Sequence, residues 1–596
     1  ARDKLYRNNG IDKKTGHPYF EDVSKAAGII EDGYGLGVVV SDINNDGWPD
    51  LYVANDYLSN DLLWMNNRNG TFSNTISRSA KHQSYSSMGV DVGDINNDGL
   101  VDVISLDMMP EDNYRQKMMY TFLTYDRYIM ERRAGYEPEF IRNMLQLNNG
   151  QRMINDTPVS FFSEVGQLAG ISETDWSWSV LMADLDNDGL RDIHITNGMG
   201  KDMINSDFII YYAASVQHAT SDFAEYYKNI RKKLNSYGVV ELRNYCYRNN
   251  GNLSFTDVSK IAGIGDTAIS NGCAYADLDN DGDLDMLVNN INKPAFVLRN
   301  DARSTIKDTL NNFINIELVG DKLNGKGIGT KVTLFANGKQ QSAEQYPVRG
   351  YLSTVDARLH FGTGKASVID SAKIIWPDGK QQVITNIKTN ALLKVNYNDA
   401  TATPAIPVLT NNNLFADISD SRGIDYKHKE TFFYDYGYQQ LLPQKYSQLG
   451  PFITDGDING DGLTDFFVGG AKGQWGKFFI QQADGSFISR ELGSGVKPQE
   501  DLGCILFDAD GDKDPDLFIN SGGNESDPGS SDYLPRLYIN DGKGNFVYDR
   551  SAIPQTIFTS AQCVAASDYD GDGDVDIFIG GRLIPRQYPS TPNSYL

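Results

Sequence analysis

The chain of 596 residues is long enough to bury several cores, and its 57 glycines and 33 tyrosines favour a turn-rich, β-rich protein. A net charge of −25 argues against nucleic acid as a partner. Four cysteines are too few for a disulfide framework, and no apolar run reaches the ~18 residues that a membrane span requires.

In chain order, the first recurring unit, residues 5–29, reads as a strand that ends in Asn-Asn-Gly, followed by a strand around Phe-x-Asp-Val. Residues 247–264 repeat this unit, and weaker copies occur at 62–76, 145–171 and 537–550. In the sequence, most copies come after a strand, an acidic loop and a second strand. Four antiparallel strands that recur every ~50 residues are typical of β-propeller blades.

The acidic loops are seven nine-residue segments with Asp or Asn at positions one, three, five and nine. They begin at Asp42, Asp94, Asp184, Asp277, Asp457, Asp508 and Asp568. Ca²⁺ needs six to eight oxygens, which alternate residues of a tight turn supply, and glycine at position six permits the bend. One copy alone is equally typical of a solvated turn, but seven copies in the same register predict metal loops. An apolar run follows each loop, which favours a β-hairpin over the helix of an EF-hand.

We predict up to seven Ca²⁺ ions, bound by side chains at positions one, three, five and nine and by the backbone carbonyl at position seven. The predicted ligands are Asp42, Asn44, Asp46, Trp48, Asp50, Asp94, Asn96, Asp98, Leu100, Asp102, Asp184, Asp186, Asp188, Leu190, Asp192, Asp277, Asp279, Asp281, Asp283, Asp285, Asp457, Asn459, Asp461, Leu463, Asp465, Asp508, Asp510, Asp512, Asp514, Asp516, Asp568, Asp570, Asp572, Asp574 and Asp576. The loop at Asp508 departs from the pattern, because Lys513 stands where glycine is expected.

Metal ligation also accounts for most of the acidity. Seven Ca²⁺ ions carry 14 positive charges, which would bring the net charge from −25 to about −11. The charge therefore does not imply a basic partner.

Two inserts interrupt the first propeller portion, which spans residues 1–300. Residues 111–141 and 207–237 read as helices, each between the second and third strands of a blade. The metal loops join the first and second strands, so the inserts are expected to form one cap on the opposite face. The cap is our candidate surface for binding a protein or glycan, although its apolar residues could equally serve to pack it on the propeller.

The acidic-loop repeat is interrupted after the fourth loop. Residues 312–397 alternate apolar and polar residues without a metal loop, which predicts a separate β-sandwich-like module. Residues 398–412 read as a linker, and 413–596 as a second propeller portion, truncated at the end of the chain. We expect a portion of a longer protein with two propellers flanking the module. The alternative is one closed propeller with the module inserted between its strands.

These motifs carry a family resemblance. The loop repeats resemble the FG-GAP/VCBS repeats of integrin α-chain propellers, and the segments 324–332, 349–354, 359–364 and 375–383 resemble an ASPIC/UnbV domain. The combination is similar to the cartilage acidic protein family, in particular its long bacterial surface members. The resemblance implies an all-β, calcium-binding protein that is extracellular or associated with the outer membrane.

The leading functional hypothesis is a non-enzymatic, calcium-stabilised surface scaffold that recognises a glycan or a partner protein. One alternative is an accessory subunit of an outer-membrane complex, docked through the helical cap. Another is a calcium-dependent polysaccharide lyase or hydrolase. The six histidines show no metal-binding spacing, and no nucleophile elbow or phosphate loop is present, so the sequence offers little support for an enzyme.

Overall fold

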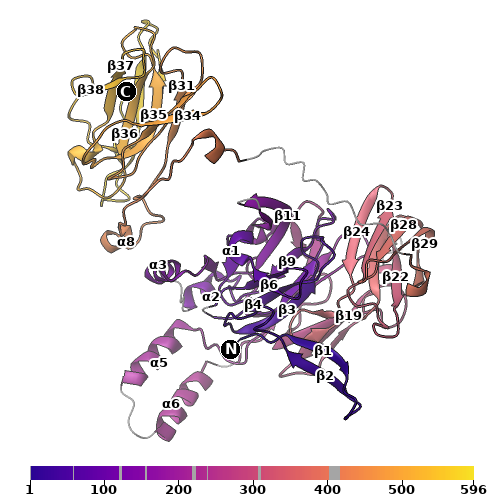
Figure 1. Ribbon diagram of the computed structural model, residues 1–596. Helices are drawn as coiled ribbons and strands as arrows, with labels where there is room; N and C mark the ends of the chain where they lie inside the picture. The colour runs from indigo at the N-terminus through magenta and orange to yellow at the C-terminus, as the bar shows by residue number, and fades with distance from the viewer. Residues whose placement is uncertain are drawn as a thin grey trace. The chain divides into compact units, whose positions relative to one another are not determined.

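The computed structural model describes residues 2–57, 59–119, 124–154, 157–217, 223–237, 239–305, 311–401 and 417–596. Strands far outnumber helices among them, as the all-β prediction requires. The chain divides into two compact units, Ala1–Asn411 and Asn412–Leu596, which are called the N-terminal and C-terminal units below (Figure 1). Most of the predicted linker at 398–412 lies outside the described residues.

Four antiparallel sheets follow one another in the N-terminal unit, each with its strands in chain order. Three of them have four strands and the fourth has three. The first sheet contains β3 (Gly35–Ser41), β4 (Asp50–Asn55), β5 (Leu62–Asn66) and β6 (Phe72–Asn74), and the second contains β8 (Val90–Gly93), β9 (Asp102–Ser105), β11 (Met144–Ile154) and β12 (Thr157–Glu164). The third contains β13 (Ser177–Ala183), β14 (Asp192–Asn197), β16 (Tyr245–Asn249) and β17 (Phe255–Asp257), and the fourth contains β19 (Ser270–Ala276), β20 (Asp285–Asn290) and β21 (Phe296–Leu298).

Successive sheets pack face to face through their alternating apolar residues. One core lies between the first two sheets and includes Val39 and Val103, and another lies between the second and third and includes Ile104 and Ile193. The first strands β3, β8, β13 and β19 are neighbours in that order. The sheets do not join into one closed sheet in the described part of the unit.

Shorter elements complete this unit. They are the hairpin of β1 (Tyr6–Ile11) and β2 (Pro18–Asp22), the strands β7 (Gln83–Ser84), β10 (Glu139–Phe140), β15 (Leu242–Arg243) and β18 (Thr267–Ala268), and the helices α1 (Ile76–Ser79), α2 (Asn113–Met118), α3 (Tyr125–Ala134), α4 (Gly166–Ala169), α5 (Ser206–Gln217), α6 (Phe223–Asn235) and α7 (Ala302–Thr305). The predicted inserts contain α2 and α3, and α5 and α6. No described helix has the length and apolar character needed to cross a membrane.

The module at 312–396 has two sheets around its own core, which includes Ile316, Leu334 and Trp376. Its strands are β22 (Asn312–Val319), β23 (Lys331–Ala336), β24 (Lys339–Glu344), β25 (Val348–Arg349), β26 (Ser353–Thr354), β27 (Leu359–Gly364), β28 (Val368–Ile375), β29 (Gln381–Lys388) and β30 (Ala391–Asn396), followed by the 3-10 turn η2 (Tyr397–Asp399). Although the module has its own core, it belongs to the same compact unit as the four sheets.

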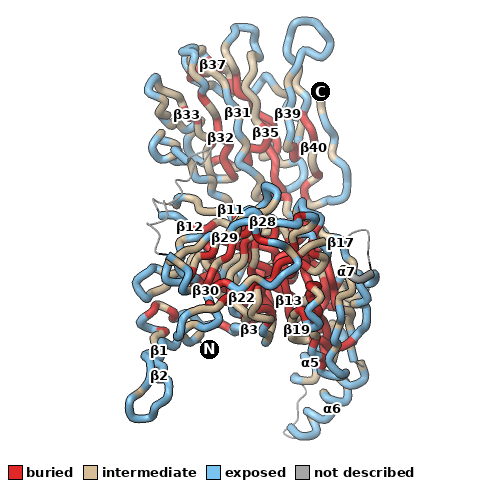
Figure 2. The backbone as a smooth tube through the Cα atoms, turned by 90° about the vertical axis from the view of Figure 1, so that its right-hand side faces the viewer, coloured by how far each residue is buried: buried red, intermediate tan, exposed pale blue. Residues whose placement is uncertain are grey.

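The C-terminal unit repeats the sheet pattern. Its elements are η3 (Asp420–Arg422), α8 (Asp435–Tyr438), β31 (Ile453–Gly456), β32 (Asp465–Val468), β33 (Lys477–Gln481), β34 (Phe487–Glu491), β35 (Glu500–Phe507), β36 (Asp516–Gly522), η4 (Ser531–Tyr533), β37 (Arg536–Asn540), β38 (Phe546–Asp549), β39 (Ser560–Ser567) and β40 (Asp576–Leu583). Two four-stranded sheets and the pair β39–β40 result, and the buried residues in Figure 2 follow their strands.

Candidate metal centres

All seven acidic loops join the first and second strands of a sheet, in one register. In each, the aspartate at position nine is the first residue of the second strand and pairs with the last residue of the first, as Asp50 pairs with Ser41. The same pairing holds for Asp102, Asp192, Asp285, Asp465, Asp516 and Asp576. The strand ladder thus fixes where every loop begins and ends.

Two residues of each loop adopt the left-handed backbone conformation. At position six, Gly47 has φ 86° and Gly189 has φ 94°. Lys513 holds the same conformation with φ 76°, so the loop that begins at Asp508 keeps its shape despite the departure in sequence. Position four is also left-handed, as at Asn45 with φ 56°, and it is Asn or Gly in every loop. Both residue types tolerate this conformation better than others do.

Backbone amides orient the carboxylates at positions one and nine. Asp42 accepts the amides of Asp46 and Gly47, both at 2.8 Å. Asp50 accepts the amide of Ile43 at 3.1 Å and that of Asn66, at the end of the third strand, at 2.8 Å. Equivalent bonds recur in the loops that begin at Asp94 and Asp184.

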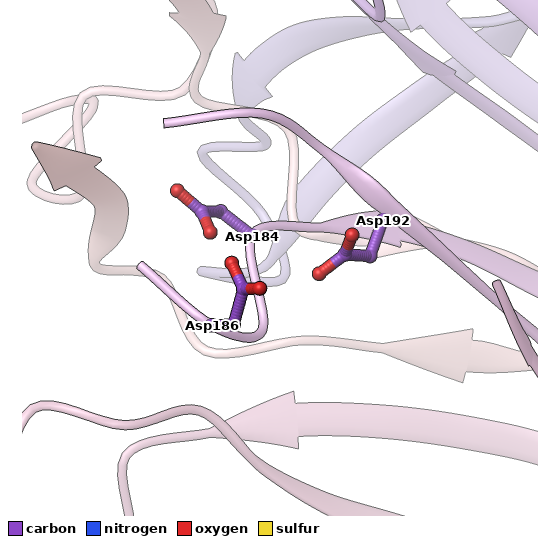
Figure 3. A group of neighbouring side chains, drawn as sticks. All are labelled: Asp184, Asp186 and Asp192. Atoms are coloured by element: carbon purple, nitrogen blue, oxygen red, sulfur yellow. The ribbon is translucent and has the colours of Figure 1, made fainter. Parts of the chain in front are cut away.

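Four loops bring three carboxylates together, with one oxygen of each within 4.8 Å of the others. The groups are Asp184, Asp186 and Asp192 (Figure 3), Asp277, Asp279 and Asp281, Asp508, Asp510 and Asp516, and Asp568, Asp570 and Asp572. Such an all-oxygen set suits a hard divalent cation. The other predicted aspartates of these four loops lie outside the groups, and the loops with Asn44, Asn96 or Asn459 at position three form no such group among the described residues.

One predicted ligand is engaged elsewhere. The Asp283 carboxylate accepts the side-chain amide of Asn187 at 2.8 Å and the backbone amide of Arg303 at 2.7 Å. At this position only a backbone carbonyl is expected to bind the metal, so these contacts leave the predicted role of the residue open.

Burial raises the pKa of several loop aspartates. It raises the pKa of Asp42 to about 6 and that of Asp50 to about 7. The pKa values of Asp184 and Asp192 lie well above the ordinary range, through burial first and the neighbouring carboxylates second. A divalent cation among these groups would favour their ionised forms, so the arrangement fits a metal.

Sequence reasoning missed a set of contacts between successive loops. The side-chain amide at position four donates to the carbonyl at position six of the next loop. The bonds run from Asn45 to Gly99 at 3.1 Å, from Asn97 to Gly189 at 2.8 Å and from Asn187 to Gly282 at 3.1 Å. The signal was the Asn at position four, which the loops at Asp457, Asp508 and Asp568 replace with Gly.

The recurring Asn-Asn-Gly has a second linking role. Its first asparagine donates its side-chain amide to two carbonyls in successive loops. Asn148 bonds to Val101 beside its own loop and to Ile43 in the preceding loop, both at 3.0 Å. Asn249 makes an equivalent pair of bonds, as does Asn540, which begins an Asn-Asp-Gly at the same place in its sheet.

The 312–396 module lies directly on the loops of the N-terminal unit. Glu344 accepts the backbone amide of Asp42 at 3.1 Å. The ring of His360 bonds to Asn187 and to Asn315, both at 2.7 Å. Arg349 forms a buried ion pair with Asp91 at 2.7 Å. The predicted metal face of this unit is therefore an interface within the chain.

Comparisons with known proteins agree with the motifs. The ASPIC and UnbV family matches residues 320–402, and the FG-GAP-like repeat family matches residues 42–105, 237–288, 457–519 and 508–579. The loop at Asp184 lies outside these matches, although its geometry is that of the others. No curated protein matches the chain significantly.

Three solved structures that match the chain are remote from it in sequence and in structure. The V. cholerae biofilm matrix protein Bap1 is 10% identical, with coverage of 99% of this chain and 83% of its own and a TM-score of 0.15. Rhamnogalacturonan lyase YesW is 10% identical, with coverage of 97% and 73% and a TM-score of 0.17. The Bacillus licheniformis rhamnogalacturonan lyase PL11 is 12% identical, with coverage of 93% and 74% and a TM-score of 0.16. Scores this low carry no argument about fold or function.

Proposed function

Since this chain is an FG-GAP-like repeat protein with an ASPIC and UnbV domain, we propose that it is a non-catalytic, calcium-stabilised scaffold at the cell surface. It acts outside the cytoplasm, where Ca²⁺ is abundant, and recognises a partner protein or a glycan. The observation that carries the proposal is the recurrence of one acidic loop, in one register, at seven sheet ends.

Calcium is the cation that these loops fit best. Their side-chain donors are carboxylate and amide oxygens, with no histidine or cysteine among the predicted ligands. Zinc and other softer metals favour nitrogen and sulfur ligands. Mg²⁺ demands stricter octahedral geometry than a loop of this kind provides and retains more of its water.

The ions would act structurally. At ~1 mM Ca²⁺ and an extracellular-type affinity of ~0.1 mM, each site adds ~1.4 kcal/mol to the free energy of unfolding. Seven such sites add up to ~10 kcal/mol, which is comparable with the entire stability of a typical domain.

We further propose that the sheets of each unit are blades of a β-propeller. The support is that four antiparallel strands run outward in chain order, that successive sheets stack face to face, and that the first strands are neighbours. Catalysis forms no part of the proposal, since the loop aspartates are arranged for a metal and His194 is buried, with its pKa lowered to about 4.

Thermal unfolding in saturating Ca²⁺, in Mg²⁺ and in EGTA tests the proposal. We expect the melting temperature to be many degrees higher in Ca²⁺ than in EGTA, with Mg²⁺ much less effective. Replacing Asp184 with Asn should reduce the number of bound Ca²⁺ ions by one in a calorimetric titration, whereas the same change at the half-buried Asp12, which lies outside the loops, should not. Equal melting temperatures in Ca²⁺ and EGTA would reject structural calcium.

A further inference from the structure

The α5–α6 hairpin projects from the sheets of the N-terminal unit (Figures 1 and 2). At its base, Phe208 is 7% exposed and the preceding Ile204 lies in a cluster with Met119 and Tyr85. Lys233 on α6 lies over the rings of Tyr211 and Tyr237, with its Nζ 5.5 and 5.2 Å from the ring centroids. The cation–π contact with Tyr211 on α5 joins the two helices.

Beyond this base, apolar side chains on both helices face the solvent. Ile210 and Val216 on α5 are 61% and 51% exposed, and Phe223 and Tyr227 on α6 are 66% and 64% exposed. Soluble proteins seldom display such a group of large apolar side chains on one protruding element unless it binds something.

Cations accompany the apolar residues. Helix α6 carries four basic residues and one acidic residue, in a chain whose net charge is −25. Lys228, Arg231 and Lys232 are exposed, and their spacing places them together beside the apolar stripe that contains Phe223 and Tyr227. Apolar and aromatic residues flanked by lysine and arginine are typical of helices that lie in a membrane interface.

We propose that the α5–α6 hairpin binds the surface of an anionic membrane. Ile210, Val216, Phe223 and Tyr227 enter the headgroup region, while Lys228, Arg231 and Lys232 contact the headgroup phosphates. A glycan is a poorer fit, because the surface is a protruding helix pair rather than a concave site with polar groups. The inference goes beyond the proposed function and does not depend on it.

Co-sedimentation of the full chain with lipid vesicles tests this proposal. We expect binding to phosphatidylcholine vesicles that contain about one third phosphatidylglycerol and little binding to phosphatidylcholine alone. Each cation near such a surface contributes about fivefold in affinity, so replacing Lys228, Arg231 and Lys232 together with Gln should weaken binding about 100-fold. Replacing Phe223 and Tyr227 with Ser should weaken it at least tenfold.

A charge-matched control separates the hairpin from general electrostatics and from calcium bridging. Lys322, Lys326 and Lys388 are exposed lysines of the 312–396 module, and their replacement with Gln should leave vesicle binding unchanged. Equal losses in the two triple variants, or a full chain that stays in the supernatant with anionic vesicles, would overturn the proposal. All variants should retain the melting temperature of the parent in Ca²⁺, because every changed side chain is exposed.

Discussion

Lys513 occupies a backbone conformation that the other loops assign to glycine. Its φ of 76° matches the left-handed values of Gly47 and Gly189, and its amide bonds to Asp508 at 3.0 Å, as the glycine amide does in other loops. A side chain with a Cβ pays about 1–2 kcal/mol for this conformation. The lysine also places a positive charge at a loop that would hold a cation.

Replacing Lys513 with Gly should therefore stabilise the C-terminal unit. We expect its free energy of unfolding in Ca²⁺ to rise by about 1 kcal/mol and the affinity of this loop for Ca²⁺ to increase. Denaturant unfolding and calorimetric titration measure the two effects. The reverse change at the equivalent position of the preceding loop, Gly462→Lys, should cost a similar amount, and a stabilising effect there would contradict the argument.

His360, at the interface between the module and the loops, makes a pH-dependent contribution to the stability of the folded state. Burial lowers its pKa to about 3, and nearby arginines act in the same direction. Between about pH 3 and 6.5 the unfolded chain binds a proton that the folded chain does not, so the folded state loses stability as the pH falls below 6.5. At pH 5 the loss from this residue is about 2 kcal/mol.

The variant His360→Gln should isolate that contribution. We expect the difference in stability between the parent and the variant to shrink by about 2 kcal/mol from pH 7.5 to pH 5, as measured by urea unfolding at both pH values. The exposed His17, changed to Gln, serves as the control and should leave the pH dependence as it is in the parent. An unchanged difference for His360→Gln would contradict this assignment.

At the scale of elements, the metal loops of the N-terminal unit form a connected chain. The asparagines at position four join each loop to the next, whereas the C-terminal unit has glycine at all three equivalent positions. Binding of an ion at one loop should therefore favour binding at its neighbour in the first unit more than in the second, because an ordered loop fixes the carbonyl that its neighbour contacts.

The change Asn97→Gly should break one link without altering the loop's own conformation. Glycine accepts the left-handed φ, and the lost hydrogen bond should cost about 1 kcal/mol in Ca²⁺ and reduce cooperativity in the calcium titration. Asn337 also has a left-handed φ of 51°, in an exposed turn away from the loops. Asn337→Gly therefore measures the effect of the residue type alone, and an equal effect on cooperativity would refute the link.

The repeats were predictable from sequence because their periodicity is local. Seven copies of one loop reveal the hairpins, and the Asn-Asn-Gly signature reveals the third strand, as the structure shows at β11 and β16. The bonds between loops were not predictable from a single sequence, since an asparagine that spans two sheets resembles any turn asparagine. The position of the 312–396 module was missed for a related reason, because its contacts join residues roughly 170 to 300 positions apart.

At the scale of the whole molecule, calcium and module docking should be linked within the N-terminal unit. Burial first and the neighbouring Glu344 second raise the pKa of Asp42 to about 6. A cation in the first loop would neutralise the charge that Glu344 faces, so ion binding and docking should stabilise each other. Thermodynamic linkage requires that docking strengthen ion binding by the same free energy by which ion binding strengthens docking. Removing the ion should therefore weaken docking by that amount.

Hydrogen exchange measures this linkage directly. The amide of Gly350 bonds to the carbonyl of Val90 at 3.0 Å across the interface, so its protection reports docking. We expect EGTA to speed exchange at Gly350 at least tenfold, whereas β28 and β29, which pair within the module, should keep their protection. Uniform loss of protection throughout the module would instead mean that calcium stabilises its fold rather than its docking, and unchanged exchange at Gly350 would mean that the interface forms without the ions.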